Sequence, residues 1–423
     1  MISTIGNTVL DLHIHSKFSR ACSKDLLLPN IAAAAARKGI TLMGTGDFTH
    51  PGWFAMMEQE LTQTSSGFYE CKAAKTVRPV QFVPTVEIAC IYKKNEKVRR
   101  LHVLVVAPDL SVVRKINIAL AAIGNLKADG RPMLGLDAKR LLEIVLSISE
   151  ACMFIPAHVW TPWFSVFGSK SGFDSLEECF EELTPYVTAI ETGLSSDPQM
   201  NWQISHLDKV TLLSNSDAHS LDNLGREATV LTGMDWTYDA LRHALSNTQS
   251  NKIVGTIEFY PEEGKYHVDG HAMCGVRLLP DETRQLQGVC PKCGRSVTVG
   301  VLSRASQLAD RMVTERPSSR PDYVSIVPLR EILSEVIGVG KHSKAVARIY
   351  EQLVPTVGTE FEVLIDAPLA RIQAATSPAV ADAVNRVRRG AVTITPGYDG
   401  IFGSISLYGL EGPPGPAEKT IFG

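Results

Sequence analysis

The chain has 423 residues, of which 44% are hydrophobic and 21% charged, with a formal net charge of −3 at pH 7. This composition is typical of a soluble globular protein and excludes binding to nucleic acid by bulk charge, which needs a much larger excess of Lys and Arg. No apolar run is long enough to span a bilayer, and "MISTIGNTVL" lacks the basic start and apolar core of a signal peptide. We therefore expect no membrane contact and a cytoplasmic location.

Short apolar runs alternate with helical patterns along the first 250 residues. The runs predict buried strands at residues 8–15, 39–47, 80–92, 101–108, 151–160, 187–194 and 210–219. The patterns between them predict helices at residues 29–39, 109–124, 137–150, 175–183 and 237–247. This alternation predicts an α/β fold, either a largely parallel sheet or a closed barrel with outer helices.

Histidines and carboxylates follow the apolar runs, where a parallel barrel places its active site, and for that reason we favour the barrel. His13 and His15 are two residues apart and so project from one face of a strand, and "SNSDAH" repeats this spacing. His50 and His102 occupy less regular positions. The candidates are His13, His15, Asp47, His50, Glu87, His102, His158, Asp217 and His219.

So many ionisable groups can be buried together only with a counter-charge. A lone histidine at a strand end is more often a core or surface residue than a ligand. The paired HxH and DxH patterns, in contrast, combine residue types that bind hard or borderline cations. We therefore expect divalent metal ions at this position.

Six segments, in chain order, resemble the metal-binding motifs of the polymerase and histidinol phosphatase (PHP) superfamily: "DLHIHS", "GTGDFTH", "PTVEIAC", "LHVLVV", "PAHVWTPW" and "SNSDAHS". This resemblance implies a distorted (β/α)7 barrel that holds two or three divalent ions. Within the superfamily, the loop "HVWTPWFSVFGSKSGFDSLEECF" and the region after it most resemble endonuclease Q, a family of DNA-repair nucleases. The resemblance covers nearly the whole chain.

The resemblance also implies roles for individual residues. The ligand positions of the superfamily match His13, His15, Glu87, His102, His158, Asp217 and His219. Two departures occur: "SRAC" stands where many relatives have an acid or histidine, and Asp47 and His50 are separated, so that either or both complete the cluster. Arg20 in the altered segment either neutralises a phosphate or forms a surface salt bridge.

Several ions close together can activate water near neutral pH, hold a scissile phosphate and stabilise charge on the leaving oxygen. The expected reaction class is therefore metal-assisted phosphoester hydrolysis, and Zn, Mn, Mg and Fe each suit the ligand types. We expect Glu87 to bridge two ions and Asp217 to bridge or to orient the attacking water. The predicted catalytic residues are Asp217, Glu87 and His219.

A second metal site is predicted from "HAMC" and "CPKC". His271, Cys274, Cys290 and Cys293 have a spacing suited to a tetrahedral structural zinc, with His267 as the alternative histidine. The folding of this small module would depend on its ion.

Further features suggest contact with DNA. Gly338 and Gly340, followed by Lys341, lie between two helical patterns and resemble a helix-hairpin-helix, although an ordinary glycine-rich turn explains them nearly as well. Large rings at the expected metal rim either stack on an unpaired base or pack a long loop; these are Trp53, Trp160, Trp163 and Phe164.

These observations predict three domains: a PHP barrel at residues 1–260, a zinc-binding module at 261–302 and a mainly helical C-terminal region at 303–423. Family resemblance implies cleavage of DNA on the 5′ side of a deaminated base (uracil, hypoxanthine or xanthine) or of an abasic site. Two alternatives remain: a phosphatase or exonuclease that acts on small or terminal phosphate esters, and a non-catalytic, zinc-dependent DNA-binding protein. The tail "GLEGPPGPAEKTIFG" predicts a flexible end, and a sliding clamp is a candidate partner for it.

Overall fold

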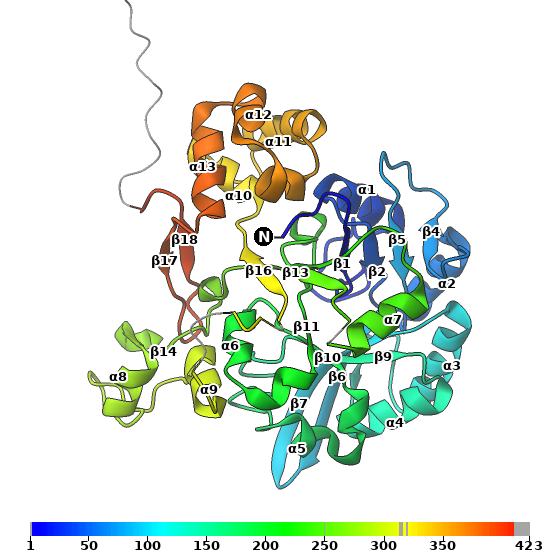
Figure 1. Ribbon diagram of the computed structural model, residues 1–423. Helices are drawn as coiled ribbons and strands as arrows, with labels where there is room; N and C mark the ends of the chain where they lie inside the picture. The colour runs from blue at the N-terminus through cyan, green and yellow to red at the C-terminus, as the bar shows by residue number, and fades with distance from the viewer. Residues whose placement is uncertain (1, 249, 313–315, 319, 410–423) are drawn as a thin grey trace, which may run out of the picture.

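The computed structural model describes residues 2–248, 250–312, 316–318 and 320–409, so the predicted tail segment after Gly409 lies outside the described residues. Figure 1 shows strands in the centre and helices around them, which confirms the mixed α/β class. The strands of the main body are β1 Thr8–Asp11, β2 Leu42–Gly44, β3 Leu61–Gln63, β4 Tyr69–Cys71, β5 Gln81–Val83, β6 Thr85–Lys94, β7 Lys97–Val106, β8 Met133–Leu134, β9 Met153–Pro156, β10 Ala189–Glu191, β11 Thr211–Leu213, β12 Ala228–Leu231, β13 Ile253–Glu258 and β16 Asp322–Ser325.

These strands pair in three sheets. The largest has the order β16-β13-β12-β1-β2-β5-β4-β3, in which β1, β2 and β5 are parallel and β12 runs antiparallel to β1. The second has the order β8-β6-β7-β9, and the third pairs β10 with β11. Hydrogen bonds beyond the ladders connect the sheets at the carboxyl ends of the strands, for example from His15 N–H to the Ala218 carbonyl and from Val159 N–H to the Glu191 carbonyl.

The strands of all three sheets enclose one apolar cluster. It takes alternate residues from eight strands, as expected where one face of each strand points inward, and helix α7 (Tyr238–Ser246) adds Tyr238 and Leu241, with Trp236 just before the helix. Within the described residues, however, the strand pairing is divided among separate sheets and forms no single closed ladder. Closure into a (β/α)7 barrel is therefore not confirmed.

The predicted strand at residues 80–92 is two strands. β5 ends at Val83 in the large sheet and β6 begins at Thr85 in the second, because Pro84 between them has no N–H for a ladder. β6 and β7 then form a long antiparallel hairpin, whose second strand begins at Lys97 rather than at Leu101. His102 consequently lies in the middle of a strand and Glu87 near the start of one.

The predicted helices of the first 250 residues are present, although the segment at 175–183 divides into α5 and a 3-10 turn. Sequence features explain their ends: Gly39, with φ of 98°, ends α1, and the Asp109 carboxylate accepts from two backbone N–H groups at the start of α3. The helices are α1 Leu28–Lys38, α2 Pro51–Glu60, α3 Leu110–Ala121, α4 Ala138–Ile148, α5 Leu176–Phe180, α6 Pro198–Trp202 and α7. The short 3-10 helices are Glu181–Tyr186, Ser205–Lys209, Leu221–Asn223, Pro261–Glu263 and Ala272–Cys274.

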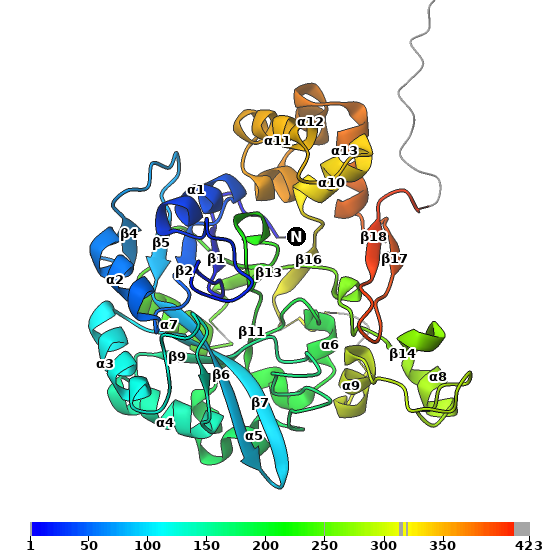
Figure 2. The ribbon, with the colours of Figure 1, turned by 180° about the vertical axis from the view of Figure 1, so that it is seen from behind.

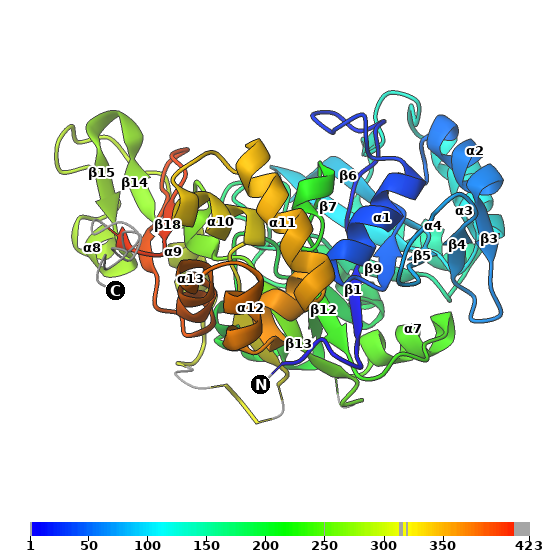
Figure 3. The same cartoon turned by 90° about the horizontal axis from the view of Figure 1, so that it is seen from above.

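The remainder of the chain forms a small module and a helical group. The module, β14 (Asp269–His271), β15 (Val276–Leu278) and α8 (Pro280–Gln285), lies at the opposite end of the molecule from α2 and α3 (Figure 3) and has its own small core of Val276, Leu278, Cys290 and Val297. The other elements are α9 Val301–Leu308, α10 Leu329–Ile337, α11 Lys344–Val357, a π-helix Glu362–Asp366, α12 Leu369–Ala375, α13 Pro378–Arg388, β17 Thr393–Thr395 and β18 Ser404–Ser406.

β16 comes from beyond residue 302 yet pairs in parallel with β13 at the edge of the large sheet. The proposed domain boundaries therefore remain a prediction. None of the helices in the described ranges has the length and apolar character that crossing a membrane requires.

Two buried carboxyl groups lie where β12 meets β13. Glu258 Oε2 accepts hydrogen bonds from Ser214 and Thr192 and so connects β13 to the ends of β11 and β10. Its Oε1, like Oε2 of Glu227, has no hydrogen-bond partner among the described residues. Burial raises the pKa of Glu258 to about 8, and burial together with Glu258 raises the pKa of Glu227 well above its usual range.

Ionisation of Glu258 is predicted to destabilise the fold. Its pKa is about 8 in the folded chain against 4.5 for an ordinary glutamate, so the folded state binds the proton more tightly, and stability falls as pH rises through this window. The side chain in Glu258→Gln cannot ionise, so the variant should not lose stability in this way. Between about pH 5 and about pH 8, the difference in free energy of unfolding, variant minus wild type, should increase by roughly 1–3 kcal/mol. Urea unfolding at both pH values measures this, with Glu70→Gln, an exposed position, as the control. An identical pH dependence in wild type and Glu258→Gln would contradict the prediction.

Candidate metal centre

Four predicted residues converge where β1 and β11 end and β6 begins. His13 and His15 follow β1, Glu87 belongs to β6 and Asp217 follows β11. His15 Nε2 lies 3.0 Å from Asp217 Oδ1, and His13 Nε2 lies 3.7 Å from the same oxygen. One ligand atom from each of the four residues lies within 4.8 Å of the others, so this group can hold a metal ion.

Glu87 also belongs to a second group. Its Oε2 lies 3.4 Å from His15 Nε2 and 3.6 Å from His13 Nε2, whereas its Oε1 lies 2.6 Å from His102 Nδ1 and 3.0 Å from His158 Nε2. The two oxygens of one carboxylate thus face two different sets of imidazoles. Because Glu87 is fully buried, the surrounding side chains, rather than solvent, determine the orientation of its carboxylate.

The residues fit divalent cations. His13 Nε2 is buried, faces Glu87 and Asp217, and has no hydrogen-bond partner among the described residues. A buried nitrogen left unpaired in this way is destabilising unless another partner fills the gap between these groups. Imidazole nitrogens and carboxylate oxygens are ligands for Zn, Mn and Fe, and the donor set does not select one of them.

Glu191, which the sequence analysis did not single out, supports both groups. Its carboxylate contacts His13 Nδ1 at 2.9 Å, accepts from the backbone N–H of His158 at 3.0 Å and accepts from Asn215 Nδ2 at 2.8 Å. A carboxylate behind a ligand imidazole fixes its tautomer and orientation. Glu191 ends an apolar run, as several of the candidates do, so the same pattern could have identified it.

Asp47, His50 and His219 lie outside both groups, and their ligand roles remain predictions. Asp47 Oδ1 is 3.1 Å from His15 Nδ1, and its Oδ2 accepts from Ser16 and Ser19, so Asp47 lies behind His15 and orients it. His50 accepts from Gly52 N–H at the start of α2 and stacks on Phe18. His219 is at the rim, with Nδ1 3.6 Å from Asp217 Oδ1.

Charges in the centre favour ionised carboxylates. Burial alone would raise the pKa of Glu87, but the imidazoles of His102 and His13 and the guanidinium of Arg131 lower it well below its usual range. Burial would likewise lower the pKa of His13, and the carboxylates of Glu191 and Glu87 outweigh it and raise that pKa. The sequence analysis also missed Arg131, whose Nη1 donates to Glu87 Oε2 at 3.0 Å.

Backbone conformation at the centre is unusual. Asp47, His158 and Asp217 have positive φ of 49°, 31° and 46°, a region that residues other than glycine rarely adopt. Gly193 lies against His158, where an added Cβ would approach the His158 Cβ to 2.4 Å. The strand ends therefore turn sharply, and these turns aim the side chains into the centre.

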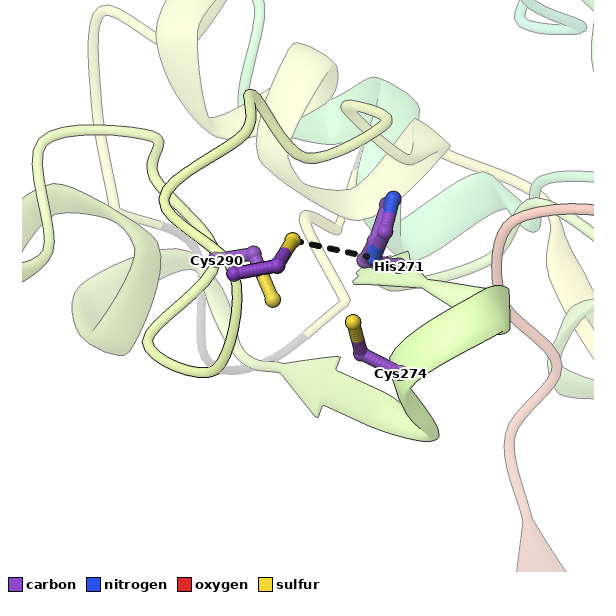
Figure 4. A group of neighbouring side chains, drawn as sticks. His271, Cys274 and Cys290 are labelled. Atoms are coloured by element: carbon purple, nitrogen blue, oxygen red, sulfur yellow. Dashed lines mark hydrogen bonds between the residues drawn. The ribbon is translucent and has the colours of Figure 1, made fainter.

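The predicted zinc ligands also come together. Figure 4 shows His271, Cys274 and Cys290 pointing toward one another, and with Cys293 their ligand atoms all lie within 4.8 Å. Cys293 Sγ is 3.7 Å from His271 Nδ1. His267 lies outside this group, and its buried Nδ1 has no partner among the described residues, so His271 is the histidine that the structure brings to the thiols.

Comparison with known proteins gives matches along most of the chain. Residues 328–391 match the family model described as the MJ0043 C-terminal domain. The protein YqxK of Bacillus subtilis is 30% identical over 93% of this chain and 98% of its own length. The protein MJ0043 of Methanocaldococcus jannaschii is 36% identical over 59% of this chain, and the chain spans only 31% of that relative's length.

Among solved structures, the lesion-specific endonuclease PfuEndoQ of Pyrococcus furiosus matches with a TM-score of 0.82 and 33% identity over 95% of both chains. The chain belongs to the endonuclease Q family. A second endonuclease Q structure, in complex with a 27-mer duplex substrate with an abasic lesion at the active site, gives the same TM-score and identity over 95% of this chain and 96% of that one.

The aromatic residues expected to contact DNA in this endonuclease Q homologue fall into two classes. Trp53 and Trp160 are fully buried, and their indole N–H groups donate to Gly46 O and Asn201 Oδ1, so both belong to the core and present no face to a base. Trp163 packs edge-on against Tyr266 beside a cavity. The Phe164 ring lies 4.6 Å from that of His102.

Of the polar candidates, Arg20 has a side chain that is 86% exposed and approaches Asp129. Gly338, with φ of 74°, ends α10, and Ser343 caps α11, so the two helices are joined by the short turn that the glycines predict. Lys341 Nζ donates to Glu331 within the chain. The contacts of these residues with DNA remain predictions.

Glu191 is predicted to hold the metal ligands in place. Glu191→Gln removes the charge behind His13, so metal affinity should fall roughly 10–100-fold while the fold persists. Isothermal titration calorimetry of the metal-free protein with Mn²⁺ measures the affinity, and circular dichroism checks that the variant is folded. Glu177→Gln, on α5, is the control. Unchanged affinity would contradict the role of Glu191.

Removing one thiol should empty the predicted zinc site. Cys290→Ser should contain one zinc fewer per chain than wild type and should expose the loop to proteolysis, because a small metal module depends on its ion. Elemental analysis measures the zinc. Cys71→Ser, which removes a buried thiol in β4, should retain it. Equal zinc content in wild type and Cys290→Ser would show that these residues hold no zinc.

Proposed function

We propose that this protein is a metal-dependent DNA repair endonuclease that hydrolyses the phosphodiester on the 5′ side of a deaminated base, such as uracil, hypoxanthine or xanthine, or of an abasic site. The observation that carries the proposal is Glu87, whose two oxygens face two groups of potential ligands. Membership of the endonuclease Q family supports the DNA substrate, since a relative has been captured with a duplex that contains an abasic lesion at its active site.

In this proposal, His13, His15, Glu87 and Asp217 would hold one ion, and Glu87, His102 and His158 would hold a second. Divalent ions at these positions would activate water and stabilise charge on the scissile phosphate. Glu191 and Asp47 hold the imidazoles of His13 and His15. Asp217 and His219 face the same rim, where they can orient the attacking water or receive its proton.

A cavity of about 700 Å³ beside the centre supports a large substrate. It is lined by Trp163, Lys265, Tyr266 and Lys341, and also by Arg226, whose guanidinium donates to the Asp217 carbonyl. The cavity therefore lies next to the segment that carries Asp217 and reaches α10 and the turn before α11, although none of the residues of the two metal groups lines it. Cations and rings in one cleft suit a phosphate backbone with an unstacked base.

Several finer points belong to the same proposal. We infer a PHP-type barrel for residues 1–260, a structural zinc at residues 261–302, a helix-hairpin-helix at Gly338 and Gly340, and a cytoplasmic location. The common apolar cluster inside the strands supports the barrel, and the four converging ligands support the zinc.

Incubation with duplex DNA containing one uracil, hypoxanthine or abasic site, in the presence of Mg²⁺ or Mn²⁺, tests the function. The expected product is a nick with a 3′-hydroxyl on the 5′ side of the lesion. Asp217→Asn should slow nicking by roughly 10²–10⁴-fold while DNA binding is retained. Cleavage of a chromogenic phosphomonoester without lesion preference would instead indicate a phosphatase, and binding without cleavage would indicate a non-catalytic protein.

A further inference from the structure

The β6–β7 hairpin extends away from the body of the molecule, on the side opposite the helices α10 to α13 (Figures 1 and 2). Its two strands pair along their full length, from Thr85 with Val106 to Lys94 with Lys97. Successive side chains point to opposite faces, so the hairpin has two faces of different composition. One of them continues directly from the metal centre.

The face that carries Glu87 and His102 is basic and open. Outward from these residues, Ile91 is paired with Arg100 and Lys93 with Val98. Lys93 is exposed, Val98 is 53% exposed, and Arg100 is half-buried over the Phe164 ring. The exposed Lys170 lies beside the edge of β7 next to Arg100, because the neighbouring Ser171 accepts from the Arg100 N–H and donates its hydroxyl to the Arg100 carbonyl.

On the opposite face of the hairpin, two cations form ion pairs within the fold. Lys94 forms an ion pair with Glu181 at 2.7 Å, and Arg99 pairs with Glu178 at 3.2 Å, both against the α5 region. In contrast, Lys93, Arg100 and Lys170 form no ion pair with any described residue. Two cations of the opposite face are thus paired within the fold. Lys97 on that face, like Lys93, Arg100 and Lys170, forms no ion pair with a described residue and is available to a partner.

We propose that this face of the hairpin binds the phosphate backbone of the DNA substrate on one side of the cleavage site. The proposal rests on the proposed nuclease function, and we refer to Lys93, Arg100 and Lys170 as the hairpin cations. Two observations favour DNA as the partner: the cations are free in a chain of net negative charge, and their surface is continuous with the metal centre.

Spacing sets how far along the DNA the contact should lie. Lys93 lies six positions beyond Glu87 in the same extended strand, which corresponds to a distance of roughly 20 Å. At about 3.4 Å per base pair, this places the outermost cation roughly six base pairs from the scissile phosphate. A duplex with fewer base pairs than this between the scissile phosphate and its end cannot contact Lys93.

The test combines the triple variant Lys93→Gln/Arg100→Gln/Lys170→Gln with lesion duplexes of different arm lengths. The slope of log affinity against log salt should fall in magnitude by about 2–3, and Kd should rise roughly tenfold at 0.1 M salt. The cleavage rate at saturating protein should change less than about twofold, because these side chains contact the backbone and not the reacting atoms. The control, Lys75→Gln/Lys209→Gln/Lys252→Gln, removes the same charge from exposed positions that precede β5, β11 and β13, at the opposite end of the strands.

Arm length identifies the contact. Shortening the duplex to about four base pairs on one side of the lesion should abolish the difference between wild type and variant, whereas shortening the other side should preserve it. Lys93→Gln/Lys170→Gln leaves the half-buried Arg100 intact and should still lower the slope by about 2, which separates DNA contact from misfolding. If wild type cuts the lesion duplex but the hairpin and control variants have equal slopes, the hairpin proposal is wrong. If wild type does not cut it, the proposed function is wrong.

Discussion

The burial of one carboxylate determines how this protein can work. Glu87 is removed from solvent and surrounded by four imidazoles and a guanidinium, which lower its pKa and keep it ionised. A buried charge without compensation is strongly destabilising, so the strand ends must bring positive groups or cations to it. The antiparallel hairpin provides this arrangement, since β6 carries Glu87 and β7 carries His102, while β1 and the segments after β9 and β11 bring the remaining ligands.

Short-range spacing made the ligands predictable from the sequence. The HxH pair and the CxxC pair each place two potential donors on one face or in one turn, and the structure brings both pairs into groups that can hold a metal ion, whereas only Asp217 of the DxH pair joins such a group. The existence of most strands and helices follows from the same local patterns. The choice of His271 over His267 depends on how the module folds, but the three thiols could be assigned without it.

What could not be predicted depends on contacts between distant segments. Asp47 and His15 approach because two parallel strands end together, and this approach places Asp47 behind the His15 imidazole and outside both metal groups. Trp53 and Trp160 follow candidate ligands in the sequence, yet both rings turn inward and are covered by other segments. The missing N–H of Pro84 could have predicted that the apolar run at residues 80–92 divides into two strands. The assignment of these two strands to different sheets required the complete strand order.

The position of β16 has a consequence for biosynthesis. This strand pairs with β13 at the edge of the large sheet, although more than sixty residues separate the two in the sequence. Until the ribosome has released residue 325, β13 presents unpaired backbone groups, which is a template for association with other nascent chains. The segment with His271 and the three thiols, and then α9, emerge during that interval, so they can fold before β16 arrives to cover this edge.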